Sequence, residues 1–115
     1  MKYEQVTRRK YPRKAYRKVI SLMYDGKSCV ANAIEIGEGG LSFAIEEKLS
    51  PPKKIIVNFF LTEKDFFSVR VTLLNTFKQG SGFTYGVSFD DVSIALKRQI
   101  RAYVARKTPT KYDLV

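Results

Sequence analysis

The chain has 115 residues and a formal net charge of +10, with 21 Lys and Arg residues against 11 Asp and Glu residues. This length suits a single domain, and a hydrophobic fraction of 44% is sufficient for a core. With one cysteine and no histidine, the chain excludes an internal disulfide, a zinc site of the usual ligand types and a histidine-activated nucleophile. No run of about 18 apolar residues is present, so we expect no membrane insertion and a cytoplasmic location.

The positive charge is concentrated near the two ends of the chain. Residues 1–18 contain eight Lys and Arg and one Glu, and residues 91–107 contain five Lys and Arg and one Asp. The segment between them, residues 19–90, has seven basic and eight acidic residues. If the fold brings the two basic segments together, they form one positive patch that suits an anionic partner.

Residues 1–15 form a basic arm in this interpretation. The stretch T-R-R-K-Y-P-R-K, residues 7–14, shows no helical or strand period and contains Pro12 within its charge run. Proline lacks an N–H and disfavours helix, so we expect an extended or looped segment. Its arginines suit bidentate binding of phosphate oxygens or the O6/N7 edge of guanine. A solvated arm with no ligand is the alternative.

Six segments from Tyr16 onward alternate apolar and polar residues with a period of two, which predicts six β-strands. Turn residues separate them, of which Asp25-Gly26 is the strongest hairpin signal. The side chains predicted to face the core are Tyr16, Ile20, Leu22 and Tyr24; Val30, Ile34 and Ile36; Leu41, Phe43 and Ile45; Ile55, Val57, Phe59 and Leu61; Phe67, Val69, Val71 and Leu73; and Phe83, Tyr85, Val87 and Phe89.

After Asp90 the apolar period lengthens to about 3.6 residues, which predicts a helix with Ser93 as its N-cap. Six short strands followed by one helix predict a mainly β fold, an antiparallel barrel or curved sheet whose helix covers an open end or face. The predicted apolar stripe of the helix contains Val92, Leu96, Ile100, Tyr103 and Val104, and the opposite side contains Lys97, Arg98 and Arg101.

Glu35 and the glycines that follow it form a second candidate site. Gly37, Gly39 and Gly40 lie in a predicted turn where glycine adopts positive φ at little cost, and without Cβ atoms their backbone is open to a ligand. A carboxylate beside open backbone amides can accept hydrogen bonds from the N1–H and N2–H₂ edge of guanine. A purely structural turn is the alternative.

The two candidate segments together resemble the PilZ domain, the bacterial receptor module for cyclic di-GMP. The family pattern is an R-x-x-x-R arm followed by a D/N-x-S-x-x-G turn, on a six-stranded antiparallel barrel with a C-terminal helix. Arg9 and Arg13 match the first motif. In the second motif Gly40 matches, whereas Glu35 replaces Asp or Asn and Gly37 replaces Ser.

The segment Tyr85-Gly86-Val87-Ser88-Phe89 and the helix after it also resemble the end of the family's barrel, so the resemblance covers about residues 8–105. It implies one domain made of the arm 1–15, a barrel with its helix at 16–107 and a tail at 108–115. It also implies a ligand, cyclic di-GMP, with no other cofactor. The ligand-binding residues that it implies are Arg8, Arg9, Arg13, Glu35, Gly37, Gly39 and Gly40.

The resemblance further implies a signalling role. The ligand orders the arginine arm over the barrel, and this changes the surface offered to a protein effector partner. Arg8, immediately before the first motif, is compatible with a stacked pair of ligand molecules. The departures at Glu35 and Gly37 leave a second interpretation open, in which a degenerate PilZ domain binds no nucleotide and acts through protein contacts.

A third interpretation is a small basic barrel that binds nucleic acid, in which exposed aromatic residues stack on bases and helix cations contact phosphates. For Phe60 and Phe66 we favour packing under the helix or against a partner, so we do not expect nucleic acid to be the ligand. The adjacent carboxylates at 46–47 and 90–91 have no catalytic motif around them, and we expect no enzymatic activity. The residues that nucleic-acid binding would use are Tyr11, Phe60, Phe66, Lys97, Arg98 and Arg101.

Overall fold

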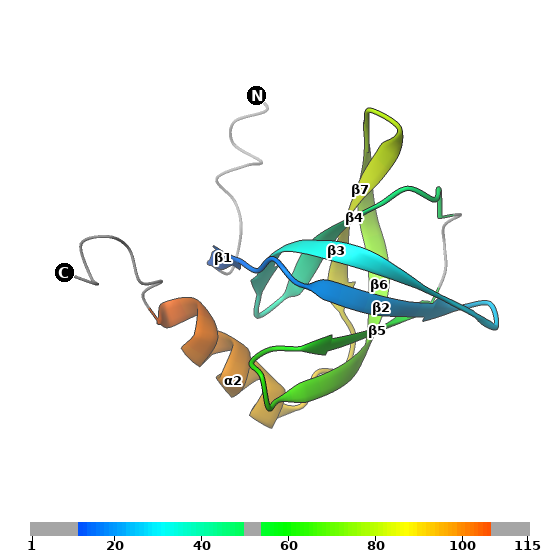
Figure 1. The fold of residues 1–115 in the computed structure, drawn as a ribbon. Coiled ribbons are helices and arrows are strands. Elements are labelled where there is room, and N and C mark those ends of the chain that lie inside the picture. Colours follow the sequence, from blue (N-terminus) through cyan, green and yellow to red (C-terminus); the bar gives the residue numbers. More distant parts are fainter. Residues whose placement is uncertain (1–11, 50–53, 107–115) are drawn as a thin grey trace.

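The computed structural model describes residues 12–49 and 54–106, which form an antiparallel barrel with one helix beside it (Figure 1). The strands are hydrogen-bonded to one another in the order β1-β3-β2-β5-β6-β7-β4. The elements are β1 (Arg13–Ala15), β2 (Val19–Tyr24), β3 (Lys27–Gly37), β4 (Gly40–Ile45), β5 (Lys54–Phe60), β6 (Phe66–Gln79), β7 (Gly82–Phe89) and α2 (Ile94–Ala105).

The predicted six-stranded antiparallel barrel with a C-terminal helix is confirmed. An additional pairing between β3 and β4 closes the sheet on itself. The sequence predicts an extended or looped arm, and the last three residues of the arm form β1, a seventh strand that the count of six did not include. The strand β2 pairs with the first part of β3, up to Asn32. Beyond the end of β2, β1 pairs with the last three residues of β3, 35–37.

The predicted inward face of β3 was wrong in its first half. Val30 is 67% exposed, whereas Ala31 and Ala33 are buried. The pairing register with β4 then shifts between Ala33 and Glu35, and this irregularity returns Ile36 to the core. A β-bulge reverses which residues face inward, so a single alternating pattern cannot describe both halves of the strand.

The other predicted strands place their alternating apolar side chains as expected. In β5, for example, Ile55, Val57 and Phe59 are buried, and the residues between them face outward. Tyr16 is also buried, and its hydroxyl donates a hydrogen bond to the carbonyl of Phe60. Burial raises the pKa of the Tyr16 hydroxyl well above its ordinary value, so the group stays a neutral donor.

The helix α2 begins where the sequence predicts. Ser93 is its N-cap, and the Ser93 Oγ accepts a hydrogen bond from the backbone N–H of Leu96 at 3.1 Å. Leu96 and Ile100 are buried in the core, and the ring of Tyr103 meets that of Tyr16 edge-to-face. Figure 1 shows α2 at the side of the barrel where β1 and the β5–β6 hairpin lie. The segment 13–18 and the basic helix are therefore neighbours, so the condition for one positive patch is met for these residues.

Within the described residues, no helix is both long enough and apolar enough to cross a membrane.

Candidate functional site

The strand β1 brings the second arginine of the arm against the glycine motif. Arg13 is the pairing partner of Gly37, and Ala15 is the partner of Glu35. The guanidinium of Arg13 lies 3.6 Å from the Glu35 carboxylate, Nη1 to Oε1, and both side chains are partly exposed, at 25% and 35%. A cation and a carboxylate from two separate segments therefore meet at the barrel surface, where an anion and a hydrogen-bond donor could each replace one partner.

Gly37 allows this close approach of β1 to β3. A Cβ atom at Gly37 would lie 2.7 Å from the carbonyl oxygen of Pro12 and 3.2 Å from Cγ of Arg13. A backbone oxygen cannot rotate away, so a larger residue would have to displace the arm. Among the described glycines only Gly26 and Gly80 have positive φ, so the predicted use of positive φ in the glycine motif was wrong.

The connection between β3 and β4 is tighter than predicted. Gly37 and Gly40 are themselves paired strand residues, and the turn consists of Glu38 and Gly39. A Cβ atom at Gly40 would overlap the carbonyl oxygen of Val87 in β7. The physical role that the structure gives Gly40 is thus strand packing.

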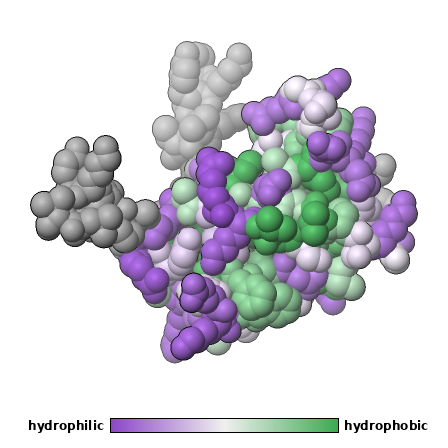
Figure 2. Space-filling view, in the orientation of Figure 1, coloured by the Kyte–Doolittle hydropathy of each residue, from purple (hydrophilic) through white to green (hydrophobic). Residues whose placement is uncertain are grey.

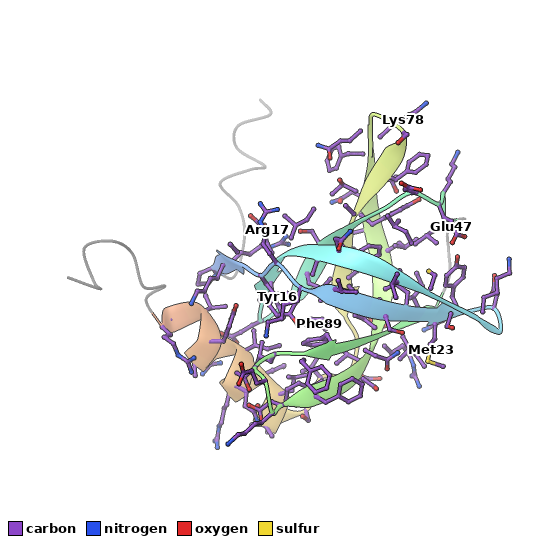
Figure 3. The ribbon with its side chains drawn as sticks, in the orientation of Figure 1. Tyr16, Arg17, Met23, Glu47, Lys78 and Phe89 are labelled. Atoms are coloured by element: carbon purple, nitrogen blue, oxygen red, sulfur yellow. The ribbon has the colours of Figure 1, made fainter. Side chains whose placement is uncertain are left out.

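The carbonyl of Gly39 is also engaged, because it accepts a hydrogen bond of 2.9 Å from the backbone N–H of Phe89. This bond ties the two-residue turn to the end of β7, so the turn has a fixed position relative to the barrel. Phe89 is labelled in Figure 3, near the centre of the ribbon.

Lys14 attaches the arm to the C-terminal end of α2. Its Nζ donates hydrogen bonds to the carbonyl oxygens of Tyr103 at 3.2 Å and Arg106 at 2.8 Å, and it lies 4.6 Å from the centre of the Tyr103 ring. The last carbonyls of a helix lack intrahelical partners and carry partial negative charge, so an ammonium group is favourable there. Nothing in the local sequence pattern indicates this contact, because the bonded residues are 89 and 92 positions apart in the chain.

Glu38 attaches the glycine motif to the same helix. The Nε and Nη2 of Arg101 donate to the two carboxylate oxygens of Glu38 at 2.8 and 3.0 Å, a bidentate pair. Hydrogen bonding from Arg101 lowers the pKa of the Glu38 carboxyl. The sequence places Arg101 on the side of the helix opposite the apolar stripe, and in the structure this residue is exposed but paired.

The remaining predicted ligand residues, Arg8 and Arg9, lie outside the described residues, as does Tyr11. The structure thus brings together Arg13, Glu35 and the three glycines. It adds Lys14 and the Glu38–Arg101 pair beside them. In residues 12–49 and 54–106, no group of three or more His, Cys, Asp or Glu side chains could hold a metal ion.

Phe60 and Phe66 are not packed under the helix, so that part of the prediction was wrong. They are 48% and 52% exposed, and their rings pack against each other with centroids 4.8 Å apart.

Comparisons with solved structures give the fold. The chain is similar to the Bacillus subtilis inhibitor of motility MotI/DgrA, with a TM-score of 0.73 and 12% identity over 84% of this chain and 49% of that one. It is also similar to YcgR from Escherichia coli in complex with c-di-GMP, with a TM-score of 0.66 and 18% identity over 81% of this chain and 42% of that one. The chain spans about half the length of each of these two proteins or less.

The isolated PilZ domain of YcgR with c-di-GMP matches over more of its own length. Its TM-score is 0.64, with 17% identity over 84% of this chain and 88% of that one. A search of curated proteins gives no match. The family model described as the PilZ domain matches residues 7–106, which include both candidate segments and the helix. The chain therefore belongs to the PilZ domain family.

Proposed function

We propose that the chain is a receptor for cyclic di-GMP that signals through a protein partner. The observation that carries this proposal is the meeting of Arg13 and Glu35 on neighbouring strands. It joins the two parts of the family's ligand motif, and PilZ-domain structures similar to this chain were solved with c-di-GMP. The ligand offers the complementary groups, since its phosphates suit arginine and its guanine N1–H and N2–H₂ suit a carboxylate.

In the proposed complex the ligand replaces the ion pair between the two strands. Arg13 turns to a phosphate or to guanine O6/N7, and Glu35 accepts from the opposite guanine edge. A partly exposed ion pair contributes about 0.2–1 kcal/mol, so its loss is small beside the roughly 8 kcal/mol of a micromolar complex. Arg8 and Arg9 contribute further guanidinium groups and hold the arm against the barrel around the ligand. The backbone at Gly37, Gly39 and Gly40 forms the other side of the site.

The test is calorimetric titration of cyclic di-GMP into the wild-type chain and into an Arg9→Ala/Arg13→Ala variant. We expect a dissociation constant of about 1 μM or tighter for the wild type, and loss of the heat signal in the variant. A Lys64→Ala/Lys78→Ala variant is the matched control, because it removes two exposed cations that lie outside the arm, the glycine motif and α2. A molar ratio near two would support a stacked ligand pair beside Arg8.

A second candidate function is a PilZ domain that binds no nucleotide and acts through protein contacts alone. The observation that favours it is the space beside Gly37, which the carbonyl of Pro12 occupies in place of the family's serine side chain. A flat titration with folded wild-type protein would support this second function and contradict the first.

A further inference from the structure

One outer face of the barrel carries an exposed apolar surface that the nucleotide site does not use. It is formed by the outward side chains of β3, β2, β5 and β6, and we call it the outer face. The pairing register places apolar side chains at both ends of this face, with Met23 opposite Ile56 and Phe60 opposite Phe66. Figure 2 shows apolar side chains gathered on the side turned to the viewer. The large exposed apolar residues of the outer face are Val19, Met23, Val30, Ile56, Phe60 and Phe66.

A row of polar side chains crosses the middle of the outer face, and its members bond to one another. Asn58 donates to the Oγ of Ser21 at 3.5 Å and accepts from the hydroxyl of Ser68 at 2.6 Å. Burying a polar group is costly when it loses its hydrogen bonds, and these bonds remain when another surface covers them. The row therefore suits a surface that becomes buried in a complex.

A basic hollow lies at one end of the outer face, beside the β2–β3 hairpin. Its volume is about 470 Å³, and Met23 and Ile56 supply its apolar wall. The ion pairs Arg13–Glu35 and Arg101–Glu38 do not involve Lys27, Lys54 or Arg70, which are the cations of the hollow. Met23 is labelled in Figure 3, on the opposite side of the barrel from Tyr16. The charged residues that line the hollow are Lys27, Lys54, Arg70 and Asp25.

We propose that the outer face binds an acidic protein partner, which places an apolar side chain in the basic hollow and carboxylates beside its three cations. Exposed apolar groups beside polar residues are typical of a protein interaction site. A second copy of the chain would bring like charges together, because its net charge is also +10, so self-association is disfavoured. Nucleic acid fits less well, since the centre of the face is neutral and a phosphate backbone needs a continuous track of cations.

The spacing of the two ends of the outer face sets a length for the partner. Ile56 at the hollow and Phe60 at the aromatic pair are four residues apart on β5, or about 13 Å. The partner therefore presents two apolar contacts about 13 Å apart, which corresponds to roughly nine residues of an α-helix. The carboxylates of the partner lie at the end of its helix that enters the hollow.

The outer face and the nucleotide site are at different places on β3. Ser28, at the hollow, and Gly37, at the site, are nine residues apart, or about 30 Å along the strand. The hollow is therefore far from the nucleotide site, whereas the other end of the outer face is closer to it, because the carbonyl of Phe60 accepts a hydrogen bond from Tyr16, the residue after β1. The role of the contact in signalling rests on the proposed function, whereas the contact itself does not.

The test uses an amphipathic helical peptide of about 16 residues, long enough at roughly 24 Å to span both ends, with leucines along one side and glutamates beside them. A second peptide has lysines in place of the glutamates. Binding to the full chain is followed by amide chemical shifts. We expect shifts concentrated on β2, β5 and β6 with the glutamate peptide, a dissociation constant of about 100 μM or tighter, and at least tenfold weaker binding of the lysine peptide.

Two matched variants locate the contact. We expect Lys54→Glu/Arg70→Glu to lower the affinity for the glutamate peptide at least tenfold. The control Lys97→Glu/Arg98→Glu makes an equal change of charge on the exposed side of α2, and we expect it to change this affinity less than twofold. All four side chains are exposed, so the variants should fold. The first variant should keep its affinity for cyclic di-GMP, which separates this proposal from the proposed function.

Three results would overturn the proposal. They are the absence of saturable binding of the glutamate peptide up to about 1 mM, an equal loss of binding in both variants, and shifts of the same outer-face amides with a twelve-nucleotide oligothymidylate in place of the peptide. The last result would assign the face to nucleic acid.

Discussion

Replacing Gly37 by Ser restores the residue that the PilZ pattern has at this position, and the structure predicts that it destabilises this chain. The added Cβ would lie 2.7 Å from the carbonyl oxygen of Pro12 and 3.2 Å from Cγ of Arg13. An ordinary contact of this kind is about 3.4 Å or longer, so β1 would have to move by roughly 0.7 Å away from β3. Such a movement would disturb the pairing that holds Arg13 beside Glu35.

Two opposing terms set the size of the effect. Overpacking at a closely packed position costs about 1–3 kcal/mol. The serine hydroxyl can regain only about 0.5–1.5 kcal/mol through a hydrogen bond. We therefore expect Gly37→Ser to lower the free energy of unfolding by about 1–2 kcal/mol. For a chain of 115 residues that corresponds to a fall in Tm of about 4 °C per kcal/mol.

Thermal unfolding of the wild type, Gly37→Ser and Gly37→Ala measures this effect. Alanine adds the same Cβ without the hydroxyl, so both variants should be less stable than the wild type. The alanine variant should lose at least as much stability as the serine variant. The same serine substitution in a chain that lacks residues 1–12 should cost less, because the carbonyl of Pro12 is then absent. Equal stability of all three full-length proteins would refute the close packing of β1 on Gly37. So would a Gly37→Ser variant that binds cyclic di-GMP more tightly with no loss of stability.

Two further predictions concern the glycine motif. The pKa of Glu38 is lowered in the folded chain by Arg101, so this carboxyl adds stability that is fully present above its unfolded pKa of about 4.3 and is lost as pH falls through the lower folded pKa. With Glu38→Gln, the free energy of unfolding from urea titrations should therefore fall less steeply as pH drops below about 4.5. A fall as steep as in the wild type would contradict the pairing. Gly40→Ala should cost about 3 kcal/mol or more in chemical denaturation because its Cβ would overlap the Val87 carbonyl, and a loss below 1 kcal/mol would show that the strands can separate there.

The parts of the fold that follow from sequence are those with a long uninterrupted period. Along β5, three apolar side chains at every second position are all buried, and the pattern needs no correction. The same is true of α2, where Ser93 has the chemistry of an N-cap and Leu96 and Ile100 recur at helical spacing. In these segments local pattern and tertiary packing favour the same answer.

The parts that could not be predicted depend on contacts between distant segments. The strand β1 has no apolar period of its own, and it exists because three residues pair with the end of β3. The inward face of β3 changes at a bulge, and alanines at 31 and 33 carry too weak a signal against Val30 to reveal it. The ligand motif was recognisable as a sequence, yet its packing against Pro12 becomes visible only in three dimensions.

The contacts around the motif make it one unit with α2. Lys14, next to Arg13, is bound to the last carbonyls of the helix, and Glu38, in the turn, is bound to Arg101 one helical turn earlier. Both halves of the candidate site therefore hold the same helix, although they come from different strands. A ligand that moved Arg13 would pull on the C-terminal end of α2 through Lys14, whereas one that moved only the turn would act through Arg101. The outer face shares β3 with the motif, so β3 and α2 are the described elements through which a change at the site would be transmitted.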